Sequence, residues 1–306
     1  MPKHFLHLSD YSTDEIWELL HLAKELKIKF HNKEMYKPFK DRSLAMIFAK
    51  PSARTRVSFE TGFEWMGGHA LFLGPNDIGI GKREAIKDIS RLFSRYNDII
   101  MARLFDHEHI LELAQFSTIP VINGLTDYNH PCQILADIMT IWEHRGNLDN
   151  LKITYMGDGN NIVHSWLQLA CRLPFHFVCC SPSGFEPDLK TEKMVENSGR
   201  STYELSHDPK TAVKDADVIY TDVWASMGQK EEANEREKIF ADYQVNQRLM
   251  NKSGKETLFM HCLPAERGRE VTDSVMESKN SIVFDEAENR MHAQNAVMVY
   301  LSNKKI

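Results

Sequence analysis

Short apolar runs alternate with amphipathic, helix-like stretches along the chain, and this alternation limits the possible folds more than any other feature. Parallel strands need a long connection between them, usually a helix, so the pattern is typical of parallel α/β sheets. The apolar runs of the first half are Leu44–Ala49, Ala70–Leu73, Asp98–Met101 and Pro120–Asn123. Those of the second half are Lys152–Met156, His176–Cys180, Val218–Thr221, Thr257–Met260 and Ser281–Phe284. The sequence therefore predicts an α/β fold with two doubly wound parallel-sheet domains.

The helix-like stretches indicate how the domains are divided. Glu84–Tyr96 has apolar residues on one helical face, as expected of a helix that covers a sheet, and Gln133–His144 connects the two halves. A chain of 306 residues has the length of about two domains. We predict a first domain over residues 1–146 and a second over 147–286, with a cleft for the active site between them. The last segment, 287–306, contains a predicted helix at Ala287–Leu301 that packs back on the first domain.

Composition and charge exclude several classes of protein. The chain is 42% hydrophobic and 26% charged, as in globular proteins, and its formal net charge of -6 disfavours a nucleic-acid partner. No apolar run approaches the roughly 18 residues of a membrane-spanning helix, so we expect no membrane partner. The first residues lack a signal-peptide core. The cysteines have no disulfide-framework spacing, which favours a reducing compartment and a cytoplasmic protein. They are Cys132, Cys171, Cys179, Cys180 and Cys262.

Two motifs of the first half suggest an anion site. Ser52, Arg54 and Thr55 follow a predicted strand and open a predicted helix, where backbone N–H groups and guanidinium can hold an oxyanion. The alternative is an ordinary helix cap followed by exposed arginines. Arg103 follows another apolar strand and could supply a second guanidinium to the same place, or it could be a solvated loop residue.

A third motif of the first half combines an imidazole with a carboxamide. His130 and Gln133 lie in a turn that opens the connecting helix, and Pro131 at the helix start fixes their direction. Together they can donate to and accept from a planar carbonyl-plus-amine group, although a His-Pro turn is more often structural. Cys132 is interpreted as a packing residue.

In the second half, two turns follow predicted strands. Gly157-Asp158-Gly159-Asn160-Asn161 resembles a dinucleotide turn, but residue 162 is Ile, so the glycine pattern is incomplete and nucleotide binding is disfavoured. An Asn there could instead hold the backbone of an amino acid. Asp222 could hold an ammonium group, and Ser226 with Gly228 suggests a loop that closes over a ligand, or else a plain exit from the strand.

His261-Cys262-Leu263-Pro264 is the most specific stretch, because a strand that ends in His and Cys and stops at proline presents side chains at a sheet edge. Cys262 is either a small buried residue or a group that contacts substrate. Without a Cys-x-x-Cys pair or a His cluster in the sequence, we expect no metal site there. Arg290, early in the last predicted helix, is either a surface residue or an active-site guanidinium.

Four motifs, S-x-R-T-R, H-P-C-Q, D-x-x-x-S-M-G and H-C-L-P, occur in the order and at the separations of one family. With them the chain resembles the aspartate/ornithine carbamoyltransferase family along nearly its whole length. The last two motifs resemble its ornithine-using branch, because aspartate-using members have another residue in place of Cys262 and lack the S-M-G loop. The resemblance implies carbamoyl transfer from carbamoyl phosphate to the δ-amine of L-ornithine, giving L-citrulline and phosphate. It also implies a homotrimer with no cofactor and no metal.

The resemblance further implies a role for each matching residue. The residues implied to bind carbamoyl phosphate are Ser52, Ala53, Arg54, Thr55, Arg103, His130, Gln133, Cys262, Leu263 and Arg290. Those implied to bind ornithine are Asn161, Asp222, Ser226 and Met227. The implied catalytic residues are Arg103, His130, Asp222 and Cys262.

The chain departs from the family in one loop, and other functions stay open. Family members often carry a Gln before the Gly-Lys-Arg-Glu stretch that reaches carbamoyl phosphate in a neighbouring subunit, whereas this chain has Gly79, with Lys82 nearby. One alternative function is carbamoyl transfer to another amine, such as putrescine or an N-acylated ornithine. An NAD-dependent oxidoreductase is a more distant alternative, disfavoured by the incomplete glycine pattern.

Overall fold

The computed structural model describes residues 2–80, 83–225 and 233–303. Contacts between residues divide the chain into two compact units. The first unit joins Met1–Met139 to Glu288–Ile306, and the second is Thr140–Ala287. The ranges 1–146, 147–286 and 287–306 stay a prediction of the domain boundaries.

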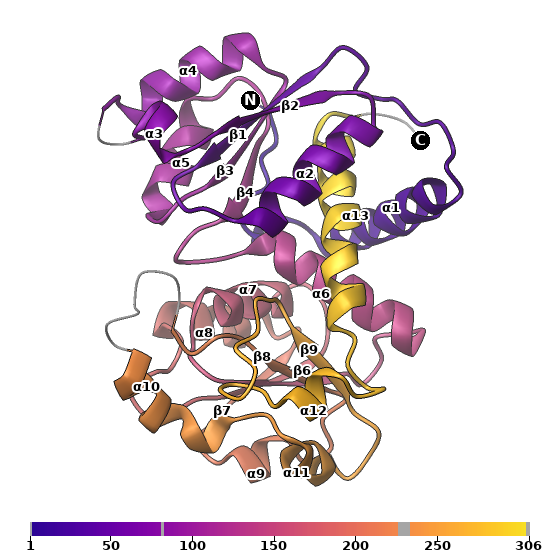
Figure 1. The fold of residues 1–306 in the computed structure, drawn as a ribbon, viewed down its shortest axis with the longest axis vertical. Coiled ribbons are helices and arrows are strands. Elements are labelled where there is room, and N and C mark those ends of the chain that lie inside the picture. Colours follow the sequence, from indigo (N-terminus) through magenta and orange to yellow (C-terminus); the bar gives the residue numbers. More distant parts are fainter. Residues whose placement is uncertain (1, 81–82, 226–232, 304–306) are drawn as a thin grey trace. The chain divides into compact units, whose positions relative to one another are not determined.

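The first unit is built around parallel strands, which Figure 1 shows together with their helices. Its strands are β1 (Ser43–Phe48), β2 (His69–Leu73), β3 (Ile99–Arg103) and β4 (Val121–Leu125). Its helices include α1 (Thr13–His31), α2 (Ala53–Trp65), α3 (Pro75–Ile78), α4 (Ile86–Tyr96) and α5 (His107–Phe116). Two further helices, α6 (Pro131–Arg145) and α13 (Val283–Leu301), run across the division between the units.

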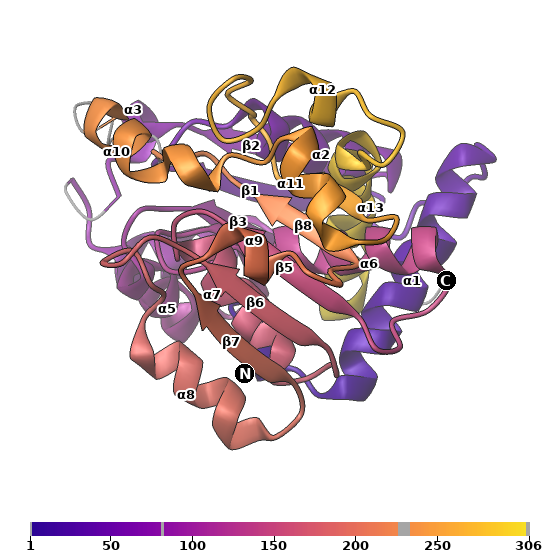
Figure 2. The same ribbon diagram turned by 90° about the horizontal axis from the view of Figure 1, so that it is seen from below.

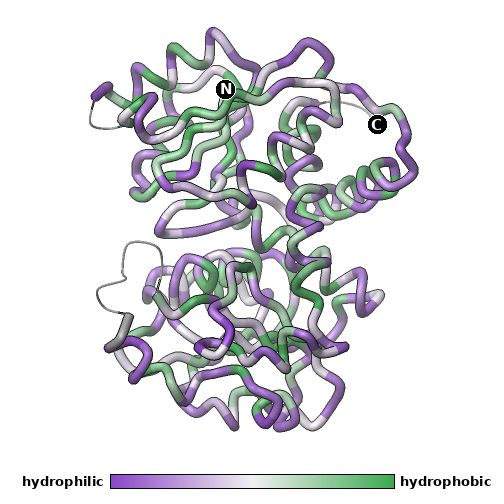
Figure 3. Tube along the Cα trace, in the orientation of Figure 1, coloured by the Kyte–Doolittle hydropathy of each residue, from purple (hydrophilic) through white to green (hydrophobic). Residues whose placement is uncertain are grey.

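In the described part of the first unit, the four strands are all parallel and lie in the order β2-β1-β3-β4. The central strands are continuous apolar runs because helices cover both faces of such a sheet. Figure 3 shows these strands as mostly hydrophobic traces, and every residue of β1, β3 and β4 is buried. The helices α2 and α13 lie very close together, since a Cβ added at Gly62 would meet Asn295 Oδ1 at 2.1 Å.

The second unit repeats this arrangement with its own core (Figure 2). Its strands are β5 (Lys152–Met156), β6 (His176–Cys180), β7 (Thr202–Ser206), β8 (Val218–Thr221) and β9 (Leu258–His261). Its helices are α7 (Asn161–Ala170), α8 (Leu189–Ser198), α9 (Pro209–Ala212), α10 (Ala233–Phe240), α11 (Gln247–Met250) and α12 (Asp273–Met276). Among the described residues the strands are parallel, in the order β7-β6-β5-β8-β9.

The predicted fold class, two doubly wound parallel sheets, is confirmed, and eight predicted strands agree with observed ones within two residues at either end. The strand predicted at Ser281–Phe284 is wrong. Only Ser281 pairs, in a single bridge with Phe259, and α13 begins at Val283. A three-residue apolar run cannot distinguish a strand from the first turn of a helix. The edge strand β7 was not predicted because its residues are mostly polar and exposed.

The remaining sequence predictions about the core have clear outcomes. The helix predicted at Glu84–Tyr96 begins two residues later, at Ile86. All five cysteines are described and are free thiols, and Cys179 and Cys180 are fully buried in β6, as predicted for core residues. Within the described residues, no helix is both long and apolar enough to span a membrane.

Candidate active site

In each sheet the strand order reverses at one position between two neighbouring strands, the topological switch point. Parallel α/β proteins bind ligands at the carboxyl ends of the strands there. In the first sheet it lies between β1 and β3, where Phe48 pairs with Arg103. In the second it lies between β5 and β8, where Met156 pairs with Thr221. The residues that follow these four strands include most of the predicted site, so each unit is described in turn.

The helix α2 begins shortly after β1, at the carboxyl edge of the first sheet. Ser52 caps the helix, since its Oγ accepts a hydrogen bond from Thr55 N at 3.3 Å and donates to Thr55 Oγ1 at 3.1 Å. The first N–H groups of a helix have no partner within the helix and carry its positive dipole end. Ser52, Ala53 and Arg54 therefore present donors after β1, as the sequence predicts, and Arg54 itself is exposed.

Two buried guanidinium groups converge on the same threonine. Arg103 Nη1 lies 3.5 Å from Thr55 Oγ1, and Arg290 Nη2 lies 3.4 Å from it. Each arginine is only 6% exposed, so neither is the surface residue that the sequence left open. The Ser52 hydroxyl and the two guanidinium groups are thus three donors to the Thr55 hydroxyl oxygen, which has only two lone pairs. Such a surplus of donors matches an anion with several acceptor oxygens, such as a phosphate.

A series of buried, hydrogen-bonded side chains connects this cluster with α6. Arg290 Nη1 donates to Gln133 Oε1, and Gln133 Nε2 donates to Asp137 Oδ1 at 2.7 Å. Gln133 and Asp137 are at most 1% exposed. The carboxylate thus orients the amide, and the amide orients the guanidinium. Arg290 is brought to this position by α13, which is far from α6 in the sequence.

His130, at the start of α6, is neutral in this environment. Burial, reinforced by the positive charges of Arg290 and Arg103, holds its pKa well below the usual value. A neutral imidazole can donate one hydrogen bond and accept one, which suits contact with a carbonyl or an amide. Its neighbour Cys132 is buried and donates to Asn123 O at 3.4 Å, and burial raises the pKa of the thiol to about 12. Cys132 is therefore a packing residue, as predicted.

The second edge has the opposite charge. Asp222 follows β8, is 8% exposed, and accepts a hydrogen bond from Cys262 Sγ at 3.0 Å. Val223 N donates to the same oxygen at 2.8 Å, and Asn160 Nδ2 donates to the other oxygen at 3.3 Å. The structure thus brings together two predicted residues from different strands. A partly buried carboxylate held by neutral donors remains an attractive partner for an ammonium group.

The His261-Cys262 pair does not present both side chains. His261 is fully buried, and its Nδ1 accepts a hydrogen bond from Leu263 N at 2.9 Å. The other nitrogen, Nε2, therefore carries the proton and faces Glu270 Oε1 at 3.1 Å. Leu263 has a φ of +56°, an unusual value for a leucine, and this hydrogen bond supports it. His261 shapes the turn, while Cys262 is the half-buried group that contacts Asp222.

The glycine turn after β5 has a packing explanation. Gly159 N donates to Phe185 O at 2.8 Å, and a Cβ at Gly159 would lie 2.3 Å from Pro187 N. Glycine is needed there for close approach to the protein's own backbone. The structure thus accounts for the second glycine of the turn without a nucleotide.

Sequence reasoning missed two polar residues near this edge, Asn160 and Arg236. Asn160 contacts Asp222, whereas the predicted residue, Asn161, opens α7 next to it. An Asn directly before an apolar helix is a recognisable cap, and Asn160 does accept from Ile162 N at 2.9 Å. Arg236 donates to Asp158 Oδ2 at 2.7 Å and to Trp224 O at 2.8 Å, which no local pattern indicates.

Some predicted residues lie outside the described part of the chain, namely Ser226, Met227 and Lys82. The structure does describe Gly79, three residues before Lys82. Gly79 ends α3 with a left-handed φ of +59°, and a Cβ there would meet Arg83 Cβ at 3.1 Å. The backbone therefore favours glycine at the place where family members often carry Gln.

Three side chains at the second edge are of metal-ligand type, since Asp222, His261 and Cys262 offer atoms within 4.8 Å of one another. Both His261 nitrogens are already engaged, one by Leu263 N and one by Glu270. A metal at this place would have to break one of these buried hydrogen bonds, which would leave the released group without a partner. The geometry therefore favours a thiol–carboxylate pair over a metal centre.

Two parallel α/β units, each with polar side chains at the switch point of its sheet, define the class of α/β proteins that bind small polar ligands at strand ends. Comparison with known proteins gives the family. Residues 3–143 match the family model described as the aspartate/ornithine carbamoyltransferase carbamoyl-P binding domain, and residues 149–301 match the Asp/Orn binding domain. The chain belongs to the aspartate/ornithine carbamoyltransferase family, which confirms the resemblance of its four motifs.

Individual relatives carry more specific names. The chain is similar to the chloroplastic ornithine carbamoyltransferase of Pisum sativum, at 58% identity over 99% of this chain and 81% of the relative. It is similar in structure to ornithine carbamoyltransferase of Pyrococcus furiosus, with a TM-score of 0.92, 50% identity, and coverage of 97% of this chain and 96% of the other. It also resembles the anabolic ornithine carbamoyltransferase of Campylobacter jejuni, with a TM-score of 0.92, 36% identity, and coverage of 99% and 100%.

Proposed function

We propose that the protein transfers the carbamoyl group of carbamoyl phosphate to the δ-amine of L-ornithine, giving L-citrulline and phosphate. The observation that carries this proposal is the contact between Cys262 Sγ and Asp222 Oδ1 at 3.0 Å. A carboxylate at this edge attracts the ammonium group of an amino acid and repels the additional carboxylate of aspartate. The names of the relatives from Pisum sativum and Pyrococcus furiosus support the same acceptor.

The first unit would bind the donor substrate. Ser52, Ala53, Arg54, Thr55 and Arg103 would hold the phosphate through backbone N–H groups and guanidinium. The carbamoyl group would be held by His130, Gln133 and Arg290, with the Leu263 carbonyl and Cys262 assigned to the same substrate. Convergence of Arg103 and Arg290 on Thr55 Oγ1 supports this arrangement, because charge develops on phosphate and carbonyl oxygens during transfer.

The second unit would bind ornithine. Asp222 would face the α-ammonium group, Asn161, Ser226 and Met227 would contact the amino acid, and Cys262 would orient the side chain. The attacking δ-amine must be neutral, although amines of this kind have a pKa near 10 in water. Exclusion of water from the occupied site would favour the neutral amine. The amine then attacks the carbamoyl carbon directly, the C–O bond to phosphate breaks, and the departing phosphate takes the amine proton.

Incubation with carbamoyl phosphate and L-ornithine, followed by measurement of citrulline and phosphate, tests this function. Equimolar formation of both products is expected, and no citrulline above the enzyme-free background would contradict the proposal. Putrescine and N-acetylornithine, offered in parallel, test the alternative acceptors. A higher kcat/KM with either amine would overturn the assignment of Asp222 to the α-ammonium group. Unchanged NADH fluorescence on mixing is the expected result for the oxidoreductase alternative.

We further propose a homotrimer in the cytoplasm, as the family resemblance and the cysteine pattern imply. Light scattering after size-exclusion chromatography should give about three times the chain mass of 35.4 kDa, and the mass of a monomer would contradict the trimer. The named relative from Pisum sativum is chloroplastic, so the compartment needs its own test. Fractionation of the source cells should place the protein with cytoplasmic markers, and recovery with an organelle would overturn this part.

A further inference from the structure

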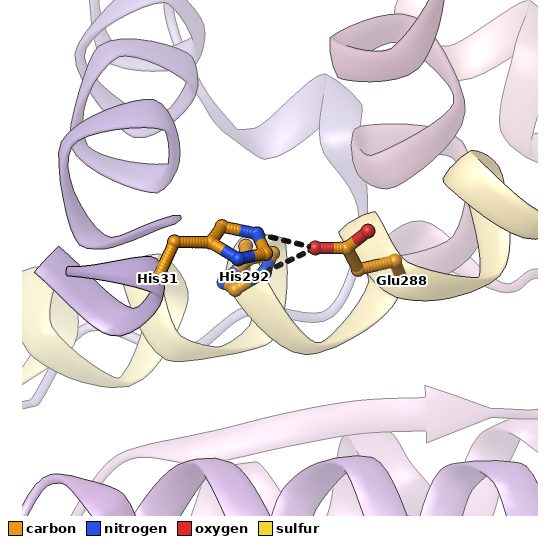
Figure 4. A group of neighbouring side chains, drawn as sticks. All are labelled: His31, Glu288 and His292. Atoms are coloured by element: carbon orange, nitrogen blue, oxygen red, sulfur yellow. Dashed lines mark hydrogen bonds and ion pairs between the residues drawn. The ribbon is translucent and has the colours of Figure 1, made fainter. Parts of the chain in front are cut away.

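A second group of metal-ligand side chains lies in the first unit and contains no residue assigned to the substrates. Figure 4 shows His31 of α1 and two residues of α13, Glu288 and His292, pointing toward one another. Both imidazole Nε2 atoms approach the same carboxylate oxygen, Glu288 Oε1, at 2.7 Å from His31 and 3.4 Å from His292. The three ligand atoms lie within 4.8 Å of one another.

We propose that His31, Glu288 and His292 form a binding site for a divalent cation of the zinc class, with water as the fourth ligand. Zn²⁺ binds imidazole nitrogen and carboxylate oxygen at about 2.0–2.2 Å in a tetrahedron, which places ligand atoms about 3.4 Å apart. The separation between Glu288 and His292 already has this value. The shorter distance from His31 must increase, which is feasible because His31 is the exposed last residue of α1.

The helices prearrange the ligands. Glu288 and His292 are four residues apart on α13, so they lie on one helical face one turn apart. His292 is fully buried, and the ring of Phe30 packs against it with centroids 5.5 Å apart, which holds the imidazole in place.

One negative and one positive side chain lie at the proposed cation site. Glu288 supplies the one negative charge among the ligands, and Lys27 of α1 is the nearby positive charge that acts on it. Lys27 Nζ donates to Asn289 Oδ1 at 2.9 Å, a neighbour of the ligand carboxylate. A bound cation would fasten the last turn of α1 to the first turns of α13. Arg290 lies between the two α13 ligands in sequence, so the metal would also immobilise the helix turn that carries this guanidinium.

Zinc binding to the EDTA-treated full-length protein tests the site. The substitution Cys262→Ser serves as the background because it removes the thiol of the Asp222–His261–Cys262 group. Calorimetric titration of this variant with ZnCl2 should give one equivalent per chain and a higher melting temperature. Cobalt should give the visible bands of a tetrahedral site without thiolate charge transfer. Absence of a zinc equivalent in this background would overturn the proposal.

Substitutions of single ligands locate the metal. Adding His31→Ala or Glu288→Gln to the background should weaken zinc binding at least tenfold and abolish the melting shift, since even loss of an outer-shell partner costs 10–100-fold. The matched control is His21→Ala, which removes another exposed imidazole from α1 and should leave the titration unchanged. His31 is exposed, so its replacement should not disturb folding. Zinc binding that is unaffected by both ligand substitutions would show that the metal lies elsewhere.

Discussion

The switch points of the two sheets have the same topology and opposite charge. After β1 and β3, guanidinium groups converge on the neutral oxygen of Thr55. In the second sheet, an amide that follows β5 and a thiol that follows β9 converge on the carboxylate of Asp222, which follows β8. The parallel sheet therefore decides where a ligand can bind, and only the few residues beyond each strand decide which ligand it is. Substitutions at the two edges should accordingly affect different substrates.

The largest expected effect is on the cationic edge. Replacing Arg54 with Ala should lower kcat/KM for carbamoyl phosphate by about 10²-fold or more, because a charged donor to the phosphate is lost. The matched control is Arg56→Ala on the same helix, whose guanidinium pairs with Glu60 at 3.1 Å. Steady-state kinetics with each substrate varied would measure both. Equal losses in the two variants would mean that general positive charge, and no specific contact, is responsible.

A smaller effect is expected at the acidic edge. Cys262→Ala removes one donor to a carboxylate, which should raise KM for ornithine about 10-fold to 100-fold. Cys262→Ser keeps a donor and should restore part of the loss. Cys171→Ala is the control, because that thiol donates to Leu167 O within α7 and the following turn. If Cys262→Ala keeps normal ornithine kinetics, the thiol does not orient this substrate, and the contrast between the edges disappears.

His261 should separate support of the site from contact with substrate. His261→Gln removes the buried contacts with Leu263 N and Glu270, so we expect a loss of about 1–3 kcal/mol in the free energy of unfolding. Denaturant titration would measure it, with His176→Gln, a half-exposed histidine of β6, as control. In this variant the free energy of unfolding of the second unit should fall by more than the free energy of carbamoyl phosphate binding. A variant as stable as the control would mean that the turn at Leu263 does not depend on this imidazole.

The smallest expected effect concerns pH. Since the pKa of His130 is lowered in the folded protein, the unfolded chain takes up a proton below about pH 6.5 that the folded chain does not. Stability should therefore fall as the pH decreases from 6.5, by up to about 1.4 kcal/mol per pH unit. His130→Asn should lose less stability than the original protein between pH 7 and 5.5, measured by denaturant titration in phosphate-free buffer. The same acid sensitivity in both proteins would contradict a neutral, buried His130.

The sequence predicted the fold well where its residues are apolar and poorly where they are polar. Buried strands such as Lys152–Met156 have a clear signal, whereas the exposed edge strand Thr202–Ser206 has none. The site was predicted from motifs that follow strands, and the structure places Thr55 shortly after β1 and Asp222 directly after β8, while the roles of these residues stay a prediction. The motif could not indicate that His261 turns inward, because that depends on Glu270. Nor could any local pattern pair Arg236 with Asp158, which is 78 residues away.

The return of α13 to the first unit has a consequence for biosynthesis. A chain emerges from the ribosome amino terminus first, and its domains generally fold as they appear. Residues 288–303 emerge after the whole second unit, yet they belong to the first unit and carry Arg290 to Thr55. The cationic cluster therefore cannot be complete in a nascent chain that stops before Arg290, even after the whole second unit has been made. Its assembly has to wait for α13.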